Sequence, residues 1–403
     1  MIKVRELADG SMRYDVRIRG SNGRVVSRTF KMRRDAQRWQ RDQLAARDDG
    51  SWVDQRLGRQ LAGDWFNEWW PTRTDLRPST RARDESHFRA HVLPQFGELQ
   101  LGVVDYRLIT TWVADLRAAG LAPATVRRCH LLLSKLLSAA VRARRIARNP
   151  CVDTDNLPTV ERSEMRVITP SQIHLLAAAM QDITVGRLSR LGGGGRLDPT
   201  TIGNIADRFA ALVLIGGYGG LRFGELAGLR RSRLDSDRRM IHVDWNLVEV
   251  RGHLVAGPPK TAAGHRSVPI PRSVFNRVIT AADSRVGDDF IFSGADGGSI
   301  RAGSFRSRYW KPATEQAGLA GLRMHDLRHT AVSLWIAHGA TPKQVQVWAG
   351  HRSVATVFDR YGHLFPGGEE SVMDSLDAAG PQLSGPGRRD AAGPELGVPD
   401  GSE

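Results

Sequence analysis

Alternating apolar and charged positions predict a β-hairpin near the amino terminus, over residues 11–30. Tyr14, Val16 and Ile18 alternate with charged residues, which is the period-two pattern of a strand with one buried face. An Asn-Gly pair supplies the turn because it tolerates positive φ, and a helix is expected from about Met32 to Ala46. The expected module is two strands, with room for a third, followed by one helix.

From residue 60 to residue 150 the apolar positions recur every three to four residues, so this stretch is predicted to be helical throughout. A first helix ends at Pro71, and Ser79 and Thr80 are expected to cap a second helix that runs to about Val92. The last helix is expected from Pro123 to about Arg148. Its predicted apolar stripe is Val126, Leu131, Leu133, Leu136, Leu137 and Ala140.

Helices and short strands alternate beyond a linker that contains Pro158. Thr169-Pro170-Ser171-Gln172 has the features of a helix start: a threonine cap, proline at the first helical position and glutamine three positions after the cap. Four glycines at 192–195 indicate a flexible loop within an insertion over 184–204. Further elements are a buried helix over about 205–217, helices from Ser304 onward, and one small antiparallel sheet over 240–243, 246–250 and 266–270.

These patterns divide the chain into three folded domains and a tail. A strand-and-helix module over 1–59 precedes a helical domain over 60–156, and a mixed α+β domain covers 157–378. Residues 379–403 are expected to be a disordered tail, because the last 23 residues hold four prolines, five glycines and no apolar pattern. The predicted fold class is multidomain and mainly α, with small antiparallel sheets.

The charge of the chain points to a polyanionic partner. Its 403 residues carry 58 basic and 43 acidic side chains, a net +15, and residues 1–60 alone carry 15 basic and 8 acidic ones. This balance favours nucleic acid, although codon bias in a GC-rich genome is an alternative, since only six of the basic residues are lysine. The residues predicted to contact DNA are Arg13, Arg17 and Arg19 on one strand face, and Arg127, Arg128 and Lys135 on the last helix.

For the hairpin arginines, the alternative is a solvated face that only keeps the edge of the sheet soluble.

The compartment is predicted from the cysteine content and from the hydropathy. Two cysteines cannot build a disulfide framework, so a reducing cytoplasm is expected. The first residues have no apolar core typical of a secretory signal, and the longest stretch free of charged residues and histidine, 209–221, is too short to span a bilayer. We therefore expect a cytoplasmic protein without membrane association.

Four clusters of residues able to carry chemistry follow one another in the carboxy-terminal half. A single short motif of this kind is weak, but the ordered set is specific. The clusters are Gly219-Gly220-Leu221-Arg222-Phe223-Gly224-Glu225, Pro258-Pro259-Lys260-Thr261 with Gly264-His265-Arg266, His325-Asp326-Leu327-Arg328-His329, and Gly350-His351 with Tyr361 ten residues later.

In this order the clusters resemble those of the tyrosine recombinase (phage-type integrase) family, whose catalytic set is Arg, Lys, His-x-x-Arg, His or Trp, and Tyr. By this resemblance 157–378 is the catalytic domain, 60–156 the helical, SAM-like core-binding domain, and 1–59 the arm-binding domain of larger integrases. The insertion over 184–204 departs from the usual spacing but contains no catalytic position. The resemblance implies the catalytic residues Arg222, Lys260, His325, Arg328, His351 and Tyr361.

These residue types suit the cleavage of a phosphodiester without a metal. Arginine forks bind two phosphate oxygens at once, so Arg222 and Arg328 suit the non-bridging oxygens. Tyr361 is the expected nucleophile, and its phenol needs a nearby base, a role that the resemblance gives to His325. His351 is expected to donate a hydrogen bond to the phosphate.

Other polar residues of the clusters have supporting roles. Lys260 is expected to act as general acid on the leaving 5′-oxygen, and Glu225, one turn after Arg222, is expected to orient its neighbours. His329 and His363 are interpreted as structural or supporting groups. No cysteine or carboxylate at ligand spacing accompanies the histidines, so no metal is predicted.

Each of these residues also has a structural explanation. His325, Arg328 and His329 could form a helix-capping network, and Tyr361 could be a core aromatic residue. For any one residue the structural explanation is the stronger of the two. The ordered set as a whole favours the functional one.

The resemblance implies a site-specific DNA recombinase that acts through a 3′-phosphotyrosyl intermediate and needs no cofactor. Its partners would be double-stranded DNA with core and arm attachment sites, three further copies of itself in a homotetramer, a host DNA-bending protein and an excision factor. The expected setting is integration or excision of a phage or mobile element at the nucleoid. The alternatives are a type IB topoisomerase, which needs no arm domain, and a catalytically idle DNA-binding regulator of the same fold.

Overall fold

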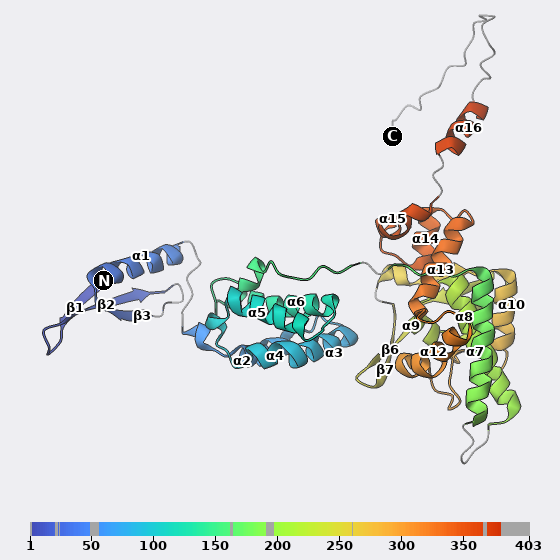
Figure 1. Ribbon diagram of the computed structural model, residues 1–403, viewed down its shortest axis with the longest axis horizontal. Coiled ribbons are helices and arrows are strands. Elements are labelled where there is room, and N and C mark those ends of the chain that lie inside the picture. Colours follow the sequence, from blue (N-terminus) through green and yellow to red (C-terminus); the bar gives the residue numbers. More distant parts are fainter. Residues whose placement is uncertain are drawn as a thin grey trace, which may run out of the picture. The chain divides into compact units, whose positions relative to one another are not determined.

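The computed structural model describes residues 2–20, 23, 25–48, 56–161, 164–190, 197–259, 261–365 and 369–379. The chain forms two units, Met1–Glu164 with Val248–Val255, and Met165–Leu247 with Ala256–Glu403. Figure 1 shows the elements of each unit in chain order, coloured from blue to red. Each unit is described by itself below.

The amino-terminal module is a three-stranded antiparallel sheet covered on one face by a helix. The strands β1 (Ile2–Glu6), β2 (Met12–Arg19) and β3 (Val25–Phe30) lie in this order, and α1 (Arg33–Asp48) follows. Because side chains alternate along a strand, Val16 and Ile18 of β2 face α1, where they pack with Ala36 and Trp39. The sequence did not decide whether this sheet has a third strand. The structure shows that it does, and the third strand is β1.

The opposite face of this sheet is basic. Arg17 and Arg19 are exposed on it, and Arg13 is half-buried. Strand β1 adds Lys3 and Arg5, which are paired in register with Asp15 and Arg13. The predicted row of arginines on one sheet face is therefore present. The predicted turn residues 21 and 22 lie outside the described residues.

Residues 57–153 of the first unit are helical, with a core rich in tryptophan and leucine. The indole of Trp65 donates to the Leu136 carbonyl at 3.1 Å, which ties the first long helix to the last. The helices are α2 (Ala62–Trp69), α3 (Pro78–His87), a π-turn (Phe88–Val92), α4 (Leu93–Phe96), α5 (Tyr106–Ala118) and α6 (Pro123–Arg142), with short 3-10 turns at Leu57–Arg59, Trp70–Thr72, Leu101–Val103 and Pro150–Asp153.

Three details of the helical prediction were wrong. The second helix begins at Pro78 with no side-chain cap, so Ser79 and Thr80 lie inside it, and the π-turn and α4 continue it to Phe96. The last helix ends at Arg142 and not near residue 148, since the chain turns there through a positive φ of 53° at residue 144. Leu131 is 43% exposed, and the next residue, a leucine, is buried in its place.

The second unit surrounds a buried helix. Its helices are α7 (Pro170–Arg190), α8 (Pro199–Gly219), α9 (Phe223–Ala227), α10 (Arg272–Ala281), α11 (Ala302–Phe305), a π-turn (Arg306–Trp310), α12 (Lys311–Gln316), α13 (Met324–Ala337), α14 (Pro342–Ala349), α15 (Val354–Tyr361) and α16 (Glu369–Ala379), with 3-10 turns at Arg231–Arg233, Ala262–Gly264 and Gly362–Leu364. Its strands are β4 (Leu234–Asp235), β5 (Met240–Val243) and β8 (Arg266–Pro269). The strands β6 (Asn246–Val250) and β7 (His253–Gly257) lie largely in Val248–Val255, the segment that belongs to the first unit.

Helix α8 is the centre of this unit and packs against α7, α10 and α13 (Figure 1). It is longer than expected, because it begins at Pro199, and α7 extends to Arg190. Most of the predicted insertion is therefore helical, and residues 191–196 of its glycine-rich part lie outside the described residues. Close packing against α13 needs a glycine, since a Cβ atom at Gly216 would lie 2.7 Å from Cδ1 of Leu327.

The capping box predicted at Thr169 is confirmed. Thr169 Oγ1 accepts from the Gln172 amide at 3.2 Å, and Gln172 Oε1 accepts from the Thr169 amide at 2.9 Å. The prediction of one three-stranded sheet was wrong for the strand over 246–250, which belongs to a different sheet. β4, β5 and β8 form an antiparallel sheet in which Val243 is opposite Arg266, whereas β6 pairs with the unforeseen strand β7.

None of the helices that the structure describes combines the length and the apolar character needed to cross a bilayer. The predicted tail lies outside the described residues from residue 380 onward.

Candidate active site

The predicted catalytic residues of the second unit lie at helix ends. Helix α8 stops at Gly220, which has a φ of +63°, a conformation that glycine adopts without strain. Arg222 then precedes α9 with extended backbone. Its amide donates to Oε2 of Glu225 at 2.8 Å, and its guanidinium Nη1 donates to Oε1 at 2.9 Å. The Arg222 side chain is still 42% exposed, so solvent and substrate can reach it.

Glu225 is the anionic centre of the site, as its predicted orienting role requires. Its carboxylate is 4% exposed and also accepts two hydrogen bonds from the buried guanidinium of Arg266, at 3.0 and 2.8 Å. Burial opposes ionisation of this carboxyl, but the hydrogen bonds and charges of Arg266 and Arg222 outweigh it and lower its pKa to about 2. Glu225 therefore stays charged and fixes two arginines at once.

Arg266 is a member of the site that the sequence reasoning did not single out. Its Nε donates to the Trp348 carbonyl at 2.6 Å, so it connects β8 with α14 as well as with Glu225. A signal was present in the sequence. In the predicted strand over 266–270, Arg266 shares the inward face with Val268 and Ile270, and an arginine on an apolar face requires a buried acceptor.

Arg328 is buried between the ends of two helices. Its Nη1 donates to the Gly220 carbonyl at 2.8 Å, and its Nη2 donates to the Ala349 carbonyl. Burial, followed by the charges of Arg222 and Arg266, lowers its pKa to about 9, so the guanidinium remains a cation at neutral pH. Arg328 therefore adds a buried positive charge close enough to Arg222 to interact with it electrostatically.

The alternative of a helix-capping network holds for Arg328, which donates to carbonyls at the ends of α8 and α14, but not for the histidines. The start of α13 is capped by Asp326, whose carboxylate accepts from the Arg323 amide at 2.8 Å. His325 takes no part in that cap, and its side chain is exposed. Atoms packed around its ring, and then the charges of His329 and Arg328, lower the pKa of His325 below its ordinary value. The ring is neutral at pH 7 and able to accept a proton.

Tyr361 is the last residue of α15 and is 1% exposed. Its hydroxyl Oη lies 2.7 Å from Nδ1 of His329, which the sequence left as a structural or supporting group. Burial raises the pKa of Tyr361, while the charges of Arg328 and Arg360 oppose that rise. The phenol is therefore protonated at rest and in direct contact with an imidazole.

His351 follows the αL glycine that ends α14, and its ring lies parallel to that of Tyr361, with 6.3 Å between centroids. Burial, followed by the charge of Arg328, lowers the pKa of His351 to about 3, so the ring is neutral. Its Nδ1 atom is buried and has no hydrogen-bond partner within the described residues. Buried polar atoms in proteins are nearly always hydrogen-bonded, so this atom is an exception.

The second unit thus brings together Arg222, Glu225, His325, Arg328, His351 and Tyr361, and adds Arg266 and His329. Lys260 lies outside the described residues, between strand β7 and the 3-10 turn at Ala262–Gly264. Its predicted role stays a prediction. Within the described parts of the chain, the one group of three metal-ligand side chains lies in the helical domain.

The predicted DNA contacts lie in the first unit, on two modules. On α6, Arg127 donates to the Pro158 carbonyl at 2.9 Å, and Arg128 forms an ion pair with the buried carboxylate of Asp84. Arg128 therefore has a structural partner that the helical pattern did not show. Lys135 is half-buried and lines an open surface hollow with Trp69, Arg73, Asp75, Ser134, Ser138 and Arg142.

Comparison with known protein families gives two matches. The model of the phage integrase family matches residues 199–367, which contain the whole cluster around Tyr361. The model of the phage integrase N-terminal SAM-like domain matches residues 63–117.

Curated relatives are integrases that the chain matches over most of their length. The ICEBs1 integrase of Bacillus subtilis (strain 168) is 25% identical over 315 residues, covering 75% of this chain and 78% of that protein. The putative prophage phiRv2 integrase of Mycobacterium tuberculosis is 24% identical over 383 residues, covering 93% and 94%.

Solved structures share the fold. The Tn1549 transposon integrase bound to a circular intermediate DNA aligns with a TM-score of 0.62 at 18% identity, over 79% of this chain and 99% of that one. A lambda integrase tetramer bound to a Holliday junction aligns with a TM-score of 0.52 at 14% identity, over 88% and 93%. The predicted fold class is confirmed by these neighbours. The family matches and the named relatives show that the chain belongs to the phage integrase family of tyrosine recombinases, enzymes of site-specific DNA recombination.

Proposed function

We propose that this recombinase cleaves and rejoins DNA through a covalent bond between Tyr361 and a DNA 3′-phosphate. The observation that carries the proposal is the position of the Tyr361 hydroxyl, which is 2.7 Å from His329 and within the electrostatic influence of Arg328, Arg360 and Arg222. A nucleophile, a proton acceptor and guanidinium groups for the phosphate are the parts that metal-free phosphoryl transfer needs.

The step is a balanced exchange of ester bonds. Tyr361 Oη attacks the phosphorus and loses its proton to an imidazole, His329 in the present conformation or the exposed His325 next to it. The bond from phosphorus to the 5′-oxygen breaks, and that oxygen takes up a proton, from Lys260 in the role that the family resemblance gives it. Attack by a 5′-hydroxyl reverses these transfers and rejoins the DNA, so no energy cofactor enters the cycle.

The developing negative charge on the phosphate meets a prearranged cationic site. Arg222 is exposed and held by Glu225, and Arg328 is held by two backbone carbonyls, so neither guanidinium has to be ordered during the reaction. The unpartnered Nδ1 of His351 is a hydrogen-bond donor for a non-bridging oxygen when the proton is on that nitrogen.

We further propose that the enzyme integrates or excises a mobile element at the nucleoid, as a tetramer on two DNA sites. The support is twofold. Several relatives are named as prophage, phage or transposon integrases, and the basic face of the β1–β3 sheet suits a second, arm-type DNA site. A host DNA-bending protein and an excision factor belong to the same proposal by analogy. No feature of the site favours a topoisomerase or an idle regulator over this function.

The proposal is tested with a nicked suicide substrate built on the attachment site found in the DNA that flanks the gene. Wild-type protein should leave a protein–DNA adduct on a denaturing gel, and mass spectrometry should place the nucleotide on Tyr361. Tyr361→Phe should bind the DNA and form no adduct. Tyr218→Phe is the matched control, because that hydroxyl contacts His174 at 3.2 Å and is not part of the site. An adduct that persists in Tyr361→Phe would refute the assignment.

A further inference from the structure

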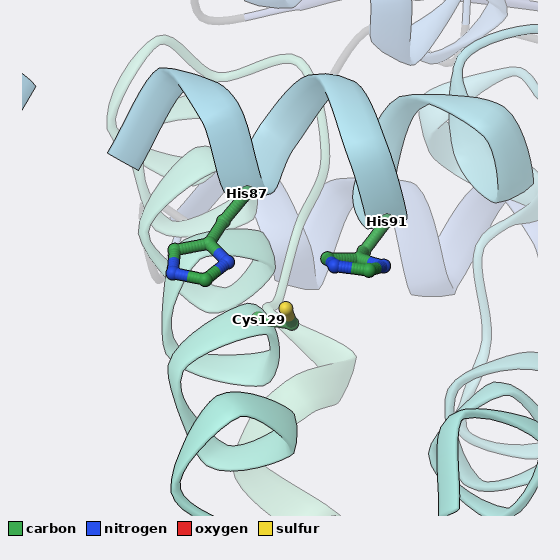
Figure 2. A group of neighbouring side chains, drawn as sticks. All are labelled: His87, His91 and Cys129. Carbon is green, nitrogen blue, oxygen red and sulfur yellow. The ribbon is translucent and has the colours of Figure 1, made fainter. Parts of the chain in front are cut away.

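Three side chains of metal-ligand type converge in the helical domain, on elements that contribute nothing to the catalytic cluster. His87 ends α3, His91 lies in the π-turn that follows, and Cys129 lies in α6. One ligand atom from each of them lies within 4.8 Å of the other two. Figure 2 shows both imidazoles extending from the same helical segment toward the Cys129 sulfur.

The local structure explains this convergence. Residues four apart on a helix lie on the same face, so His87 and His91 project together, with ring centroids 6.1 Å apart. The Trp112 indole donates to the His91 carbonyl at 3.1 Å, which fixes that turn. Cys129 is fully buried and faces the pair from α6. The Cys129 thiol is not in a disulfide.

Two imidazoles and one sulfur form a ligand set suited to a particular class of ion. Magnesium and calcium prefer oxygen ligands, whereas zinc is bound by imidazole nitrogen and thiolate sulfur. At bond lengths of about 2.0 Å to nitrogen and about 2.3 Å to sulfur, a tetrahedral ion needs ligand atoms about 3.5 Å apart. Small side-chain rotations bring atoms within 4.8 Å of one another to that separation.

We propose that His87, His91 and Cys129 bind a zinc ion, with water as the fourth ligand. Binding transfers the thiol proton to solvent and leaves a thiolate on the metal. The nearby arginines Arg83 and Arg128 form ion pairs with the buried carboxylate of Asp84, which offsets their repulsion of a cation. The negative charge of the thiolate neutralises one of the two positive charges of the ion. The proposal is independent of the recombination chemistry.

Occupancy would join α3 and the π-turn to α6 by metal–ligand bonds. Arg127 and Arg128 immediately precede Cys129 on α6, so the ion would also fix the backbone from which these two predicted DNA contacts project. Because the ion binds the folded domain, zinc should raise the unfolding temperature of the protein.

The test uses the full-length protein, stripped with a chelator and titrated with Co²⁺ alone. Wild-type protein should develop a near-ultraviolet thiolate-to-cobalt band and intense visible bands, and Zn²⁺ should displace both. His87→Asn, His91→Asn and Cys129→Ser should each lose the thiolate band or weaken binding at least about tenfold. The chain offers matched controls, since Cys151 is the second buried cysteine and His130 is the neighbour of Cys129. Cys151→Ser and His130→Gln should retain the spectrum.

Folding is checked by circular dichroism and by thermal unfolding without metal. His87→Asn is the safest variant, because this side chain is only half-buried. Zinc should raise the unfolding temperature of wild-type protein by several degrees and leave that of folded His87→Asn unchanged. Absence of a thiolate band in wild-type protein, or a band that survives in Cys129→Ser, would overturn the proposal.

Discussion

The Nδ1 atom of His329 lies 2.7 Å from the hydroxyl of Tyr361, with both side chains buried. This contact gives the proposed nucleophile a partner other than His325, the histidine to which the motif resemblance gives acid/base work. His325 is the accessible ring of the pair, and its plane is nearly perpendicular to that of His329, with centroids 5.0 Å apart. Substitutions of the two histidines can therefore be used to test which of them accepts the proton of Tyr361.

His329→Gln should slow adduct formation on a suicide substrate by about 100-fold, because glutamine keeps a polar contact but cannot take the phenolic proton. Burial, followed by the charge of Arg360, lowers the pKa of His329 below its ordinary 6.5. The imidazole therefore stays neutral, and the wild-type rate is maintained, until the pH falls below 6.5. Single-turnover rates of wild-type protein should fall only below pH 6.5, and the variant should lack this acid limb.

The matched control for that series is His363→Gln, since His363 is exposed two residues beyond Tyr361. It should cleave at the wild-type rate across the pH range. If His329→Gln is as fast as this control, His329 neither accepts the proton nor orients the phenol, and His325 becomes the base.

Glu225→Gln should destabilise the protein by about 3 kcal/mol at pH 7, which corresponds to a pKa lowered from 4.5 to about 2. A carboxyl with a lowered pKa stabilises the fold above its unfolded-state pKa, and that stabilisation is lost as the pH falls from 4.5 toward 2. Urea unfolding should therefore show the two proteins becoming more alike over that range. Glu315→Gln removes an exposed pair with Lys311 and should cost less than about 1 kcal/mol at every pH.

Lys260→Ala should slow cleavage of an ordinary phosphodiester far more than cleavage of a 5′-bridging phosphorothiolate. A sulfur leaving group departs without protonation, so loss of a general acid matters little on that substrate. Lys311→Ala is a suitable control, because Lys311 is exposed on α12. Equal slowing on both substrates would make Lys260 a phosphate contact and remove it from the proton transfer.

Deletion of residues 1–59 should leave cleavage of core-site DNA intact, reduce integration and remove one set of footprints beside the crossover site. The basic face of the sheet is the reason, because side chains of a small sheet can enter the major groove while arginines neutralise phosphates. Replacing Arg17 and Arg19 together with alanine should reproduce the deletion and flatten the salt dependence of arm-site binding.

Arg38→Ala with Arg41→Ala removes the same charge from exposed positions of α1 and should leave the footprints in place. Full-efficiency recombination by the truncated protein, with an unchanged footprint, would show that the sheet only improves solubility.

Much of the fold could be predicted from local pattern. The strand alternation at Tyr14 to Ile18 and the capping box at Thr169 depend on neighbouring residues, and both are found as expected. Strand β7 was missed because its partner β6 had been assigned to another sheet, and the choice of partner is a long-range property. On α6 the predicted apolar stripe included Leu131, which is exposed, in place of the next leucine, which is buried. A repeat of three to four residues does not by itself decide which of two adjacent leucines faces the core.

The proposed catalytic cluster likewise contains residues that the local sequence reveals and residues whose roles depend on distant partners. Short spaced motifs were enough to select the residues that we propose for the chemistry on DNA, since each motif is contiguous in sequence. Arg266 and His329 were undervalued because their partners, Glu225 and Tyr361, are 41 and 32 residues away. Their roles follow from burial and from hydrogen bonds that only the folded chain defines.

The two carbonyl acceptors of Arg328 belong to Gly220, where α8 ends, and to Ala349, where α14 ends. One guanidinium is thus both a brace between two helices and a proposed phosphate ligand. A local opening that moved α14 away from α8 would leave Arg328 with one of these two acceptors and loosen the guanidinium. The proposed phosphate site would then be fully ordered only while both helix ends are in place, so a partly opened molecule should cleave DNA poorly.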